Sequence, residues 1–290
     1  MAGRKSAVLI AGPTASGKSA LALRKALETG ASIANTDALQ LYDGLRLVTA
    51  RPTDDDLATV PHRLYGTVDP TRRFSTGDWA RAVQAIIAEA EGPLIFAGGT
   101  GLYFESLTNG FAEVPEVPDE AVAAAAAEVE GLDRAGRAAL IAARDPLIAA
   151  RLKAPDPQRV IRALAVLKAT GRSLGSFQDA LHRPVLDGWE IERLVLNPGR
   201  DILRERIARR FETMMEQGAV EEVAAFLERG LDPSLPAMKA IGVREIGDFI
   251  AGRSSRDEAV ERAVVATRQY AKRQRTWFRG RMADWSWIEP

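Results

Sequence analysis

The sequence predicts an α/β protein built on a doubly wound parallel sheet, with an all-helical insertion domain placed between two parts of that core. In the N-terminal part of the chain, short apolar runs typical of buried strands alternate with amphipathic stretches typical of helices. A glycine-rich stretch at 12–19 joins one such strand to the next helix. From about residue 113 the strand pattern stops, and it returns at 190–196. Helices without intervening strands indicate an insertion.

Length and composition define the class of protein. The chain has 290 residues, of which 46% are hydrophobic, so we expect a soluble globular protein with one large or two moderate domains. It has 39 basic and 39 acidic residues, so a nucleic-acid surface would require local segregation of charge. The lack of cysteine excludes disulfides, thiolate nucleophiles and cysteine zinc sites, and two histidines are too few for a histidine metal site. The apolar run near the start is too short for a signal peptide or a membrane span, so we expect a cytoplasmic protein with no membrane contact.

The stretch 12–19 has the pattern G-x-x-x-x-G-K-S/T of a phosphate-binding P-loop. A strand at 7–11 precedes it and a helix at 19–27 follows it, as the motif requires, so we expect a P-loop NTPase-like core. The glycines let the backbone form a nest of N–H donors at the positive end of the helix. Lys18 adds a point charge, and the Ser19 hydroxyl can ligate Mg²⁺. The residues predicted to hold phosphate are Gly12, Thr14, Ala15, Ser16, Gly17, Lys18 and Ser19. The alternative is a glycine-rich turn that binds no ligand.

Two further strands bring polar residues to the same edge of the sheet. Asp37 follows a strand at 31–35, and Thr100 lies in a glycine-rich turn after a strand at 93–97. In doubly wound sheets the ligand binds outside the carboxyl ends of the strands. Asp37 could bind Mg²⁺ through water or act as a general base there, or it could be the N-cap of a helix at 38–42. The strand at 93–97 ends in glycine, whereas a usual P-loop hydrolase has an aspartate that holds Mg²⁺ at such a position.

The chain divides into three segments. Residues 1–112 are the first part of the P-loop core, 113–188 the helical insertion, and 189–290 the second part of the core with its basic C-terminal helices. Within the insertion, Arg159 and Arg162 share one face of a helix that Asp156 and Pro157 open. From their spacing alone, a solvated face is the simpler explanation.

The second part of the core ends in a helix with segregated charge. A strand at 190–196 and a helix at 200–217 precede it, and the last helix is expected from Ser255 to about residue 280. That helix has one basic stripe at intervals of four, three and four residues, formed by Arg268, Lys272, Arg275 and Arg279. In a neutral protein such a stripe favours contact with a phosphate backbone, with an ordinary surface helix as the alternative.

Motifs along most of the chain resemble those of tRNA dimethylallyltransferases, the isopentenyl-tRNA (IPP) transferase family. The matching motifs, in order, are GPTASGKS at 12–19, TDALQLY at 36–42, TARP at 49–52, GGTGLY at 98–103, DPQRVIRAL at 156–164, RERIARRF at 204–211, IGVRE at 241–245 and ATRQYAKRQRTWFR at 266–279. Their order and spacing are far more specific than the P-loop pattern alone.

The resemblance implies transfer of a dimethylallyl group from dimethylallyl diphosphate to the exocyclic amine of the adenosine 3′-adjacent to the anticodon in tRNA. Diphosphate would leave with Mg²⁺ from the P-loop, and the insertion would grip the anticodon stem-loop. Asp37 matches the family's general base, Thr100 a residue lining the reaction channel, and Arg206 an arginine facing the diphosphate. We expect a monomer. The residues expected to contact tRNA are Asp37, Ala38, Leu39, Gln40, Gln158, Arg159, Val160, Ile161 and Arg162, together with Arg275 and Arg279.

The chain departs from the family's usual pattern at three places. Ala38 replaces a serine beside the expected base, Val48 replaces the glycine and Arg51 the lysine of a Gly-Thr-Ala-Lys-Pro motif, and Ala-Pro-Asp at 154–156 replaces Pro-Asn-Asp. Two other functions fit part of the pattern. A small-molecule kinase would use the same P-loop but would not explain the insertion or the basic stripe. An RNA-binding protein that only senses nucleotide would bind tRNA without turnover.

Overall fold

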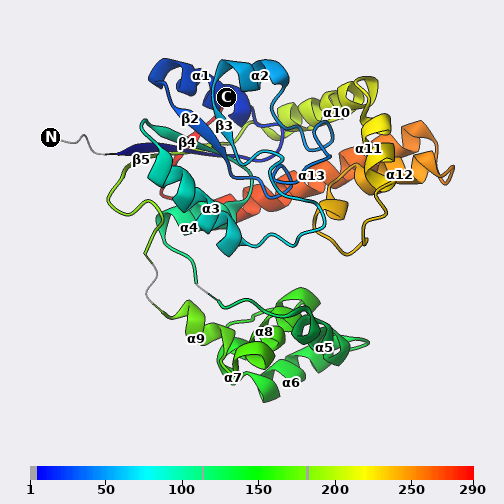
Figure 1. Ribbon diagram of the computed structural model, residues 1–290. Coiled ribbons are helices and arrows are strands. Elements are labelled where there is room, and N and C mark those ends of the chain that lie inside the picture. The colour runs from blue at the N-terminus through cyan, green and yellow to red at the C-terminus, as the bar shows by residue number, and fades with distance from the viewer. Residues whose placement is uncertain (1–4, 113, 181–182) are drawn as a thin grey trace. The chain divides into compact units, whose positions relative to one another are not determined.

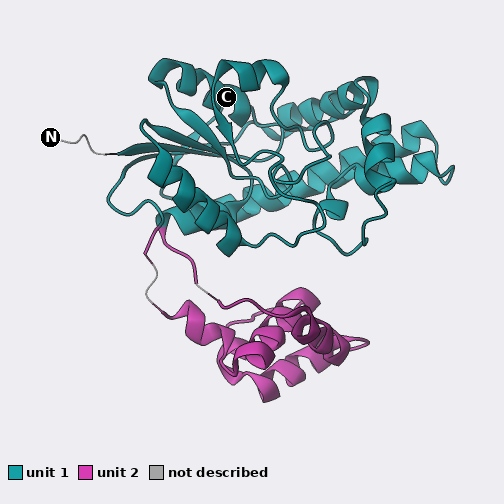
Figure 2. Cartoon of the chain, viewed as in Figure 1, with its two compact units in different colours: residues 1–108, 185–290 teal, residues 109–184 magenta. Residues whose placement is uncertain are grey.

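The computed structural model describes residues 5–112, 114–180 and 183–290, which form two compact units (Figure 2). We call residues 1–108 with 185–290 the core unit, and residues 109–184 the helical unit. Both boundaries fall four residues before those expected from the sequence, 113 and 189, and residue 113 itself lies outside the described residues. The chain rejoins the core earlier because Val185 and Leu186 donate backbone hydrogen bonds to the carbonyls of Ser106 and Leu107.

A parallel sheet of six strands forms the centre of the core unit, as the predicted α/β class requires. The strands lie in the order β3-β2-β4-β1-β5-β6, and each neighbouring pair is parallel (Figure 1). Their bounds are β1 Ser6–Ala11, β2 Ser32–Asn35, β3 His62–Arg63, β4 Leu94–Gly98, β5 Glu190–Leu196 and β6 Ser286–Ile288. Because β1 lies between β4 and β5, the P-loop that follows β1 emerges at the middle of the sheet's carboxyl edge.

Helices cover both faces of this sheet. Successive strand residues point to opposite faces, so Leu9 packs in one apolar cluster and Ile10 in the other. The cluster around Ile10 includes Ala22 and Ala26 of α1, whereas the one around Leu9 takes side chains from the remaining larger helices of the core unit. The helices of the core unit are α1 Lys18–Thr29, α2 Asp54–Thr59, α3 Thr76–Glu89, α4 Gly101–Thr108, α10 Arg200–Glu216, α11 Ala219–Leu227, α12 Val243–Ile250 and α13 Arg256–Arg281, with a 3-10 turn at Ala237–Lys239.

Most helix starts follow the signals in the sequence. Ser75 and Ser255 cap α3 and α13, and each takes part in a reciprocal capping box with the residue three positions on. In the helical unit, Asp156 caps α8 and accepts a hydrogen bond from the backbone N–H of Arg159. The helices of this unit are α5 Asp119–Val129, α6 Arg134–Arg144, α7 Pro146–Ala149, α8 Pro157–Thr170 and α9 Leu174–Gln178.

The helix considered at 38–42 is not formed. The backbone makes turns there, because the carbonyls of Gln40 and Leu41 accept hydrogen bonds from Gly66 and Val68 instead of from residues four positions on. Strand β3 is two residues long and ends where Leu64 takes a φ of +63°. Strand β6, a short strand at the edge of the sheet, was not predicted from the sequence.

No helix of the described residues combines the length and the apolar composition needed to cross a membrane.

Candidate active site

The P-loop forms a tight concave turn between β1 and α1. Ala15 and Gly17 have φ angles of +61° and +90°, both in the left-handed region. Glycine adopts this region without strain, which explains the glycine at position 17. Gly12 has no space for a side chain, because a Cβ atom there would lie 2.6 Å from Oγ of Ser16 and 3.2 Å from the carbonyl oxygen of Leu196. Ser16 is fully buried under the loop, and its N–H donates to Pro13. Its hydroxyl is therefore buried within the P-loop.

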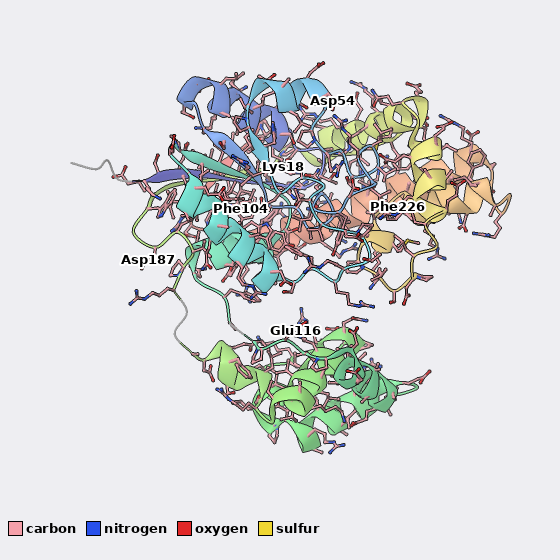
Figure 3. All side chains as sticks on the ribbon, in the orientation of Figure 1. Lys18, Asp54, Phe104, Glu116, Asp187 and Phe226 are labelled. Carbon is pink, nitrogen blue, oxygen red and sulfur yellow. The ribbon has the colours of Figure 1, made fainter. Side chains whose placement is uncertain are left out.

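Lys18 is a half-buried cation at the start of α1 (Figure 3). Its Nζ donates to the carbonyl of Pro13 at 3.3 Å, within its own loop. Burial lowers the pKa of Lys18 from 10.5 to about 8; the negative charge of Asp37 raises it, and the positive charge of Arg210 lowers it further. An anionic ligand at this position would favour the charged form of Lys18.

A cavity of about 290 Å³ lies beside Lys18, and both charged and apolar side chains line it. The polar residues include Lys18, Ser19 and Thr14 from the P-loop, Asp37 after β2, and Arg210 from α10. The remaining lining is mostly apolar or uncharged and comprises Leu39, Gln40, Val48, Thr49, Ala50, Ile207, Phe211, Met214, Ala240, Ile241, Thr267 and Tyr270. Such a cavity suits a ligand with an anionic head and an apolar tail.

Asp37 caps a turn and also faces the cavity. Its backbone N–H donates to Oδ1 of Asn35 at 2.7 Å, and its own Oδ1 accepts from the N–H of Leu39 at 3.1 Å. Its Oδ2 would lie 3.3 Å from a Cβ atom at Gly99. Tyr270 lines the same cavity, and burial raises its pKa, with a further rise from the negative charge of Asp37. The turn thus fixes one oxygen of Asp37 and leaves the other oriented toward the glycine turn after β4.

Thr100 stabilises the turn that contains Asp37. Its Oγ1 accepts a hydrogen bond from the N–H of Ala38 at 3.0 Å, and its N–H donates to the carbonyl of Thr36 at 2.9 Å. The described lining of the cavity does not include Thr100. Its hydroxyl is engaged with the backbone next to Asp37, and its expected place in a reaction channel stays a prediction.

Gln274 of α13 connects the two glycine-rich segments of the site. Its Oε1 accepts the N–H of Thr14 at 2.9 Å, and its Nε2 donates to the carbonyl of Gly99 at 3.0 Å. Gly99 and Gly101 leave no space for side chains, because Cβ atoms there would lie 2.1 Å from Gln274 and 2.2 Å from the Trp277 ring. Gln274 was not predicted from the sequence as a site residue. Gln274 and Trp277 are three residues apart, so both lie on the same face of α13 and both approach the glycine turn after β4.

The arginine that lines the cavity is Arg210, one helical turn after the expected Arg206. Burial lowers the pKa of Arg210, and the charge of Asp37 opposes this shift. Arg206 is exposed, and its Nη1 would lie 3.8 Å from a Cβ atom at Gly17, so it approaches the outside of the P-loop. Residues four apart share a helix face, so the two arginines lie along one edge of α10.

The residues expected to contact tRNA differ in accessibility. Leu39 and Gln40 line the cavity, and Gln158, Arg159 and Arg162 are exposed on α8. Val160 is fully buried in the apolar core of the helical unit, and Ile161 packs against that core. The prediction that the Val160 side chain contacts RNA is therefore wrong.

Three arginines of the core unit form a positive cluster. Burial lowers the pKa of Arg275, and the charges of Arg279 and Arg200 lower it further. Arg200 and Arg279 are exposed, so the cluster is accessible to an anionic partner. Arg200 begins α10, which means that this surface draws on two helices and not only on the basic stripe of α13.

The cavity's donors fit Mg²⁺ that arrives with an anionic substrate. No group of three or more acidic or histidine side chains that could hold a metal occurs among the described residues. Mg²⁺ commonly keeps several waters and binds through one or two carboxylates together with substrate phosphates. The Ser19 hydroxyl and the Asp37 carboxylate, which line the same cavity, are such a partial set.

A P-loop at the edge of an α/β sheet, with the cation Lys18 and the carboxylate Asp37 lining one cavity, is typical of enzymes that act on a phosphorylated substrate. Residues 40–281 match the sequence model of the family described as IPP transferase, and the chain belongs to that family. The resemblance seen in the sequence motifs is thereby confirmed.

Relatives and solved structures agree with this assignment. A tRNA dimethylallyltransferase of Agrobacterium fabrum is 47% identical over 289 residues, covering 98% of this chain and 97% of that one. One of Methylorubrum populi is 50% identical over 292 residues, covering 100% and 92%. The crystal structure of the full-length tRNA isopentenylpyrophosphate transferase from Bacillus halodurans has a TM-score of 0.69 at 29% identity and covers 99% and 90%. A eukaryotic dimethylallyltransferase acting on tRNA, at 24% identity and a TM-score of 0.78 over 94% and 70%, shows the shared fold.

Proposed function

We propose that this chain transfers a dimethylallyl group from dimethylallyl diphosphate to the exocyclic amine of the adenosine 3′-adjacent to the anticodon in tRNA, and releases diphosphate. The observation that carries the proposal is the mixed lining of one cavity, where the cations Lys18 and Arg210 occur together with the apolar side chains of Phe211 and Met214. A prenyl diphosphate likewise combines an anionic diphosphate with an apolar tail. Asp37 lies in the same lining, where it can meet the incoming amine.

In this mechanism the diphosphate is stabilised as it leaves. The amine nitrogen attacks the allylic carbon, the bond from that carbon to the diphosphate oxygen breaks, and its electron pair leaves with the diphosphate. Negative charge grows on that oxygen, and the positive charges of Lys18 and Arg210, which line the cavity, would stabilise it. Bound Mg²⁺, held by Ser19 and the diphosphate oxygens, would add positive charge there.

Asp37 acts as the general base. Its Oδ2 accepts the proton that the amine loses when the new bond forms, while the hydrogen bond from Leu39 to Oδ1 keeps the carboxylate in place. Thr100 is a positioning residue in this scheme, since its hydroxyl holds the backbone next to Asp37. Arg206, exposed beside Gly17, is placed to attract the diphosphate during binding.

The RNA would bind through charge on both units. Arg275 and Arg279 with Arg200 offer phosphate contacts on the core unit, and Gln158, Arg159 and Arg162 offer exposed polar groups on the helical unit. An adenine in an unpaired loop can be unstacked at low cost, so it can reach a cavity that a duplex base could not. We expect the chain to act as a monomer in the cytoplasm, where tRNA is modified.

Incubation of the full chain with unmodified tRNA, labelled dimethylallyl diphosphate and Mg²⁺ tests the proposal. We expect label to enter tRNA and diphosphate to be released in equal amounts. Label that stays off the tRNA, together with transfer of phosphate from ATP to a small acceptor, would favour a kinase instead.

A further inference from the structure

The segment 45–50 forms one wall of the cavity, and it is fastened by a residue far away in the sequence. We infer that this segment, the 45–50 loop, limits the length of the prenyl group, with Val48 as the specificity-determining residue and Glu222 as the positioning residue that holds the loop. The inference deepens the proposed function, since it concerns the same cavity, and it rests on that function for the nature of the ligand.

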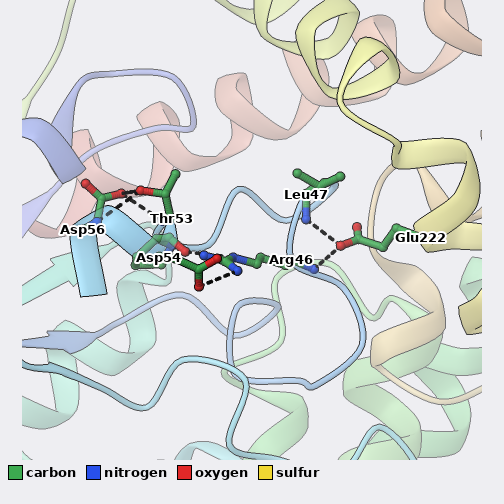
Figure 4. Close-up of polar contacts among 7 residues, drawn as sticks. Arg46, Leu47, Thr53, Asp54, Asp56 and Glu222 are labelled. Atoms are coloured by element: carbon green, nitrogen blue, oxygen red, sulfur yellow. Dashed lines mark hydrogen bonds and ion pairs between the residues drawn. The ribbon is translucent and has the colours of Figure 1, made fainter. Parts of the chain in front are cut away.

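Glu222 of α11 binds three successive backbone N–H groups of the loop. Its Oε1 accepts from Arg46 at 2.6 Å and from Leu47 at 2.7 Å (Figure 4). Its Oε2 accepts from Val48 at 3.0 Å. Hydrogen bonds to a carboxylate are stronger than neutral ones, and three of them fix both the position and the orientation of the loop. The Arg46 side chain also forms an ion pair with Asp54, in which Nη1 and Oδ1 lie 2.9 Å apart.

The other end of the loop is held by the segment that carries the catalytic carboxylate. The side-chain amide of Gln40 donates to the carbonyls of Thr49 and Ala50 at 2.8 and 2.9 Å. Ala50 has a φ of +53°, a conformation that costs energy for a residue with a Cβ atom. The loop therefore keeps one shape because contacts at both ends impose it.

Val48 lines the cavity beside other apolar side chains. It is 7% exposed and belongs to the lining, together with Phe211 and Met214 of α10. A Cβ atom at Gly242 would lie 3.3 Å from Cβ of Val48 and 3.7 Å from the Phe211 ring. Val48, Gly242 and Phe211 thus meet, and they make this part of the wall tightly packed.

The apolar part of the wall lies a short distance from the cations. Met214 is four residues, about 6 Å along α10, beyond Arg210. With its diphosphate against Lys18 and Arg210, a five-carbon tail ends near Phe211 and Met214. A ten-carbon tail would have to pass the side chain of Val48, which cannot retreat while Glu222 holds its N–H.

Val48→Ala removes two methyl groups from the wall and leaves the anchor intact. We would compare the dissociation constants of dimethylallyl diphosphate, geranyl diphosphate and inorganic diphosphate for the full chain, and the kcat/KM for transfer of each prenyl group to tRNA. We expect the preference for the five-carbon over the ten-carbon ligand to fall about tenfold or more, as is usual for a few methylenes in an apolar pocket, with no change for inorganic diphosphate. An unchanged ratio would overturn the inference.

Glu222→Gln keeps an acceptor for Arg46 and Leu47 but turns an amide N–H₂ toward the N–H of Val48. We expect the ratio of the two prenyl ligands to move in the same direction, whereas the matched control Glu221→Gln, an exposed neighbour on α11, should leave it as in the parent. A loss of thermal stability at constant ratio would show that Glu222 only supports the fold. Binding selectivity is measured without transfer, so a parent chain that binds both diphosphates but does not prenylate tRNA would refute the proposed function and not this inference.

Discussion

The half-buried charge of Lys18 makes capture of the diphosphate depend on pH. Burial lowers the pKa of this ammonium from 10.5 to about 8. A lowered pKa of a basic group means that the charge is present below the folded-state value and is lost above it. The charge that binds diphosphate should therefore fade as the pH rises through 8 in the free enzyme.

The size of the effect follows from this pKa. Lys18 would be about 90% charged at pH 7 and about 10% charged at pH 9, so kcat/KM for the prenyl diphosphate should fall close to tenfold per pH unit above 8. Bound diphosphate stabilises the ammonium and raises its pKa, so kcat itself should stay level to a higher pH. The free energy of unfolding should change in the opposite sense to kcat/KM. Between pH 8 and 10.5 the unfolded chain binds more protons, and the free energy of unfolding should rise with pH.

The assay is initial-rate kinetics from pH 6 to 10 at saturating tRNA, with Lys18→Arg as the comparison. Guanidinium stays charged throughout this range, so the variant should be slower at neutral pH because it lacks the compact ammonium, yet it should lose the break near pH 8. A parent kcat/KM that stays flat to pH 10, or a variant with the same break, would refute the assignment of this pKa to Lys18.

Three further predictions concern the other charged residues. Asp37→Ala should lower kcat by about two to four orders of magnitude with little change in tRNA affinity, and turnover close to that of the parent would remove Asp37 as the base. Arg210→Ala should raise KM for dimethylallyl diphosphate more than Arg206→Ala does, because Arg210 lines the cavity and Arg206 is exposed; steady-state kinetics with the reverse order would contradict the placement of the two arginines. Replacing Arg275 and Arg279 by glutamine should weaken tRNA binding and flatten its dependence on salt, whereas an equally steep slope in filter-binding titrations would mean that they face solvent.

The parts of the site that the sequence predicts are those fixed by local patterns. The P-loop between β1 and α1 follows from eight adjacent residues, and the place of Asp37 follows from the rule that ligands bind at the carboxyl ends of parallel strands. The start of the last helix at Ser255 is likewise set by a local contact, a capping box with the residue three positions on, and it was predicted correctly.

The missed features depend on contacts between distant segments. Glu222 holds a loop 174 to 176 residues before it, and Gln274 binds Thr14 across 260 residues. No short pattern marks either residue, because each is defined by the backbone groups that packing brings to it. The same is true of the turns at 38–42, where hydrogen bonds from Gly66 and Val68 replace those of the expected helix.

The central claim is that one cavity brings a prenyl diphosphate and an adenine amine together, and mass analysis of reacted tRNA tests it most directly. Nuclease digestion of tRNA incubated with the chain and dimethylallyl diphosphate should yield one modified nucleoside, the adenosine 3′-adjacent to the anticodon, in which a dimethylallyl group replaces one hydrogen of the exocyclic amine. The Asp37→Ala chain should give almost none. An unmodified adenosine at that position after complete incubation of the parent chain, or the group found on another nucleoside, would contradict the account.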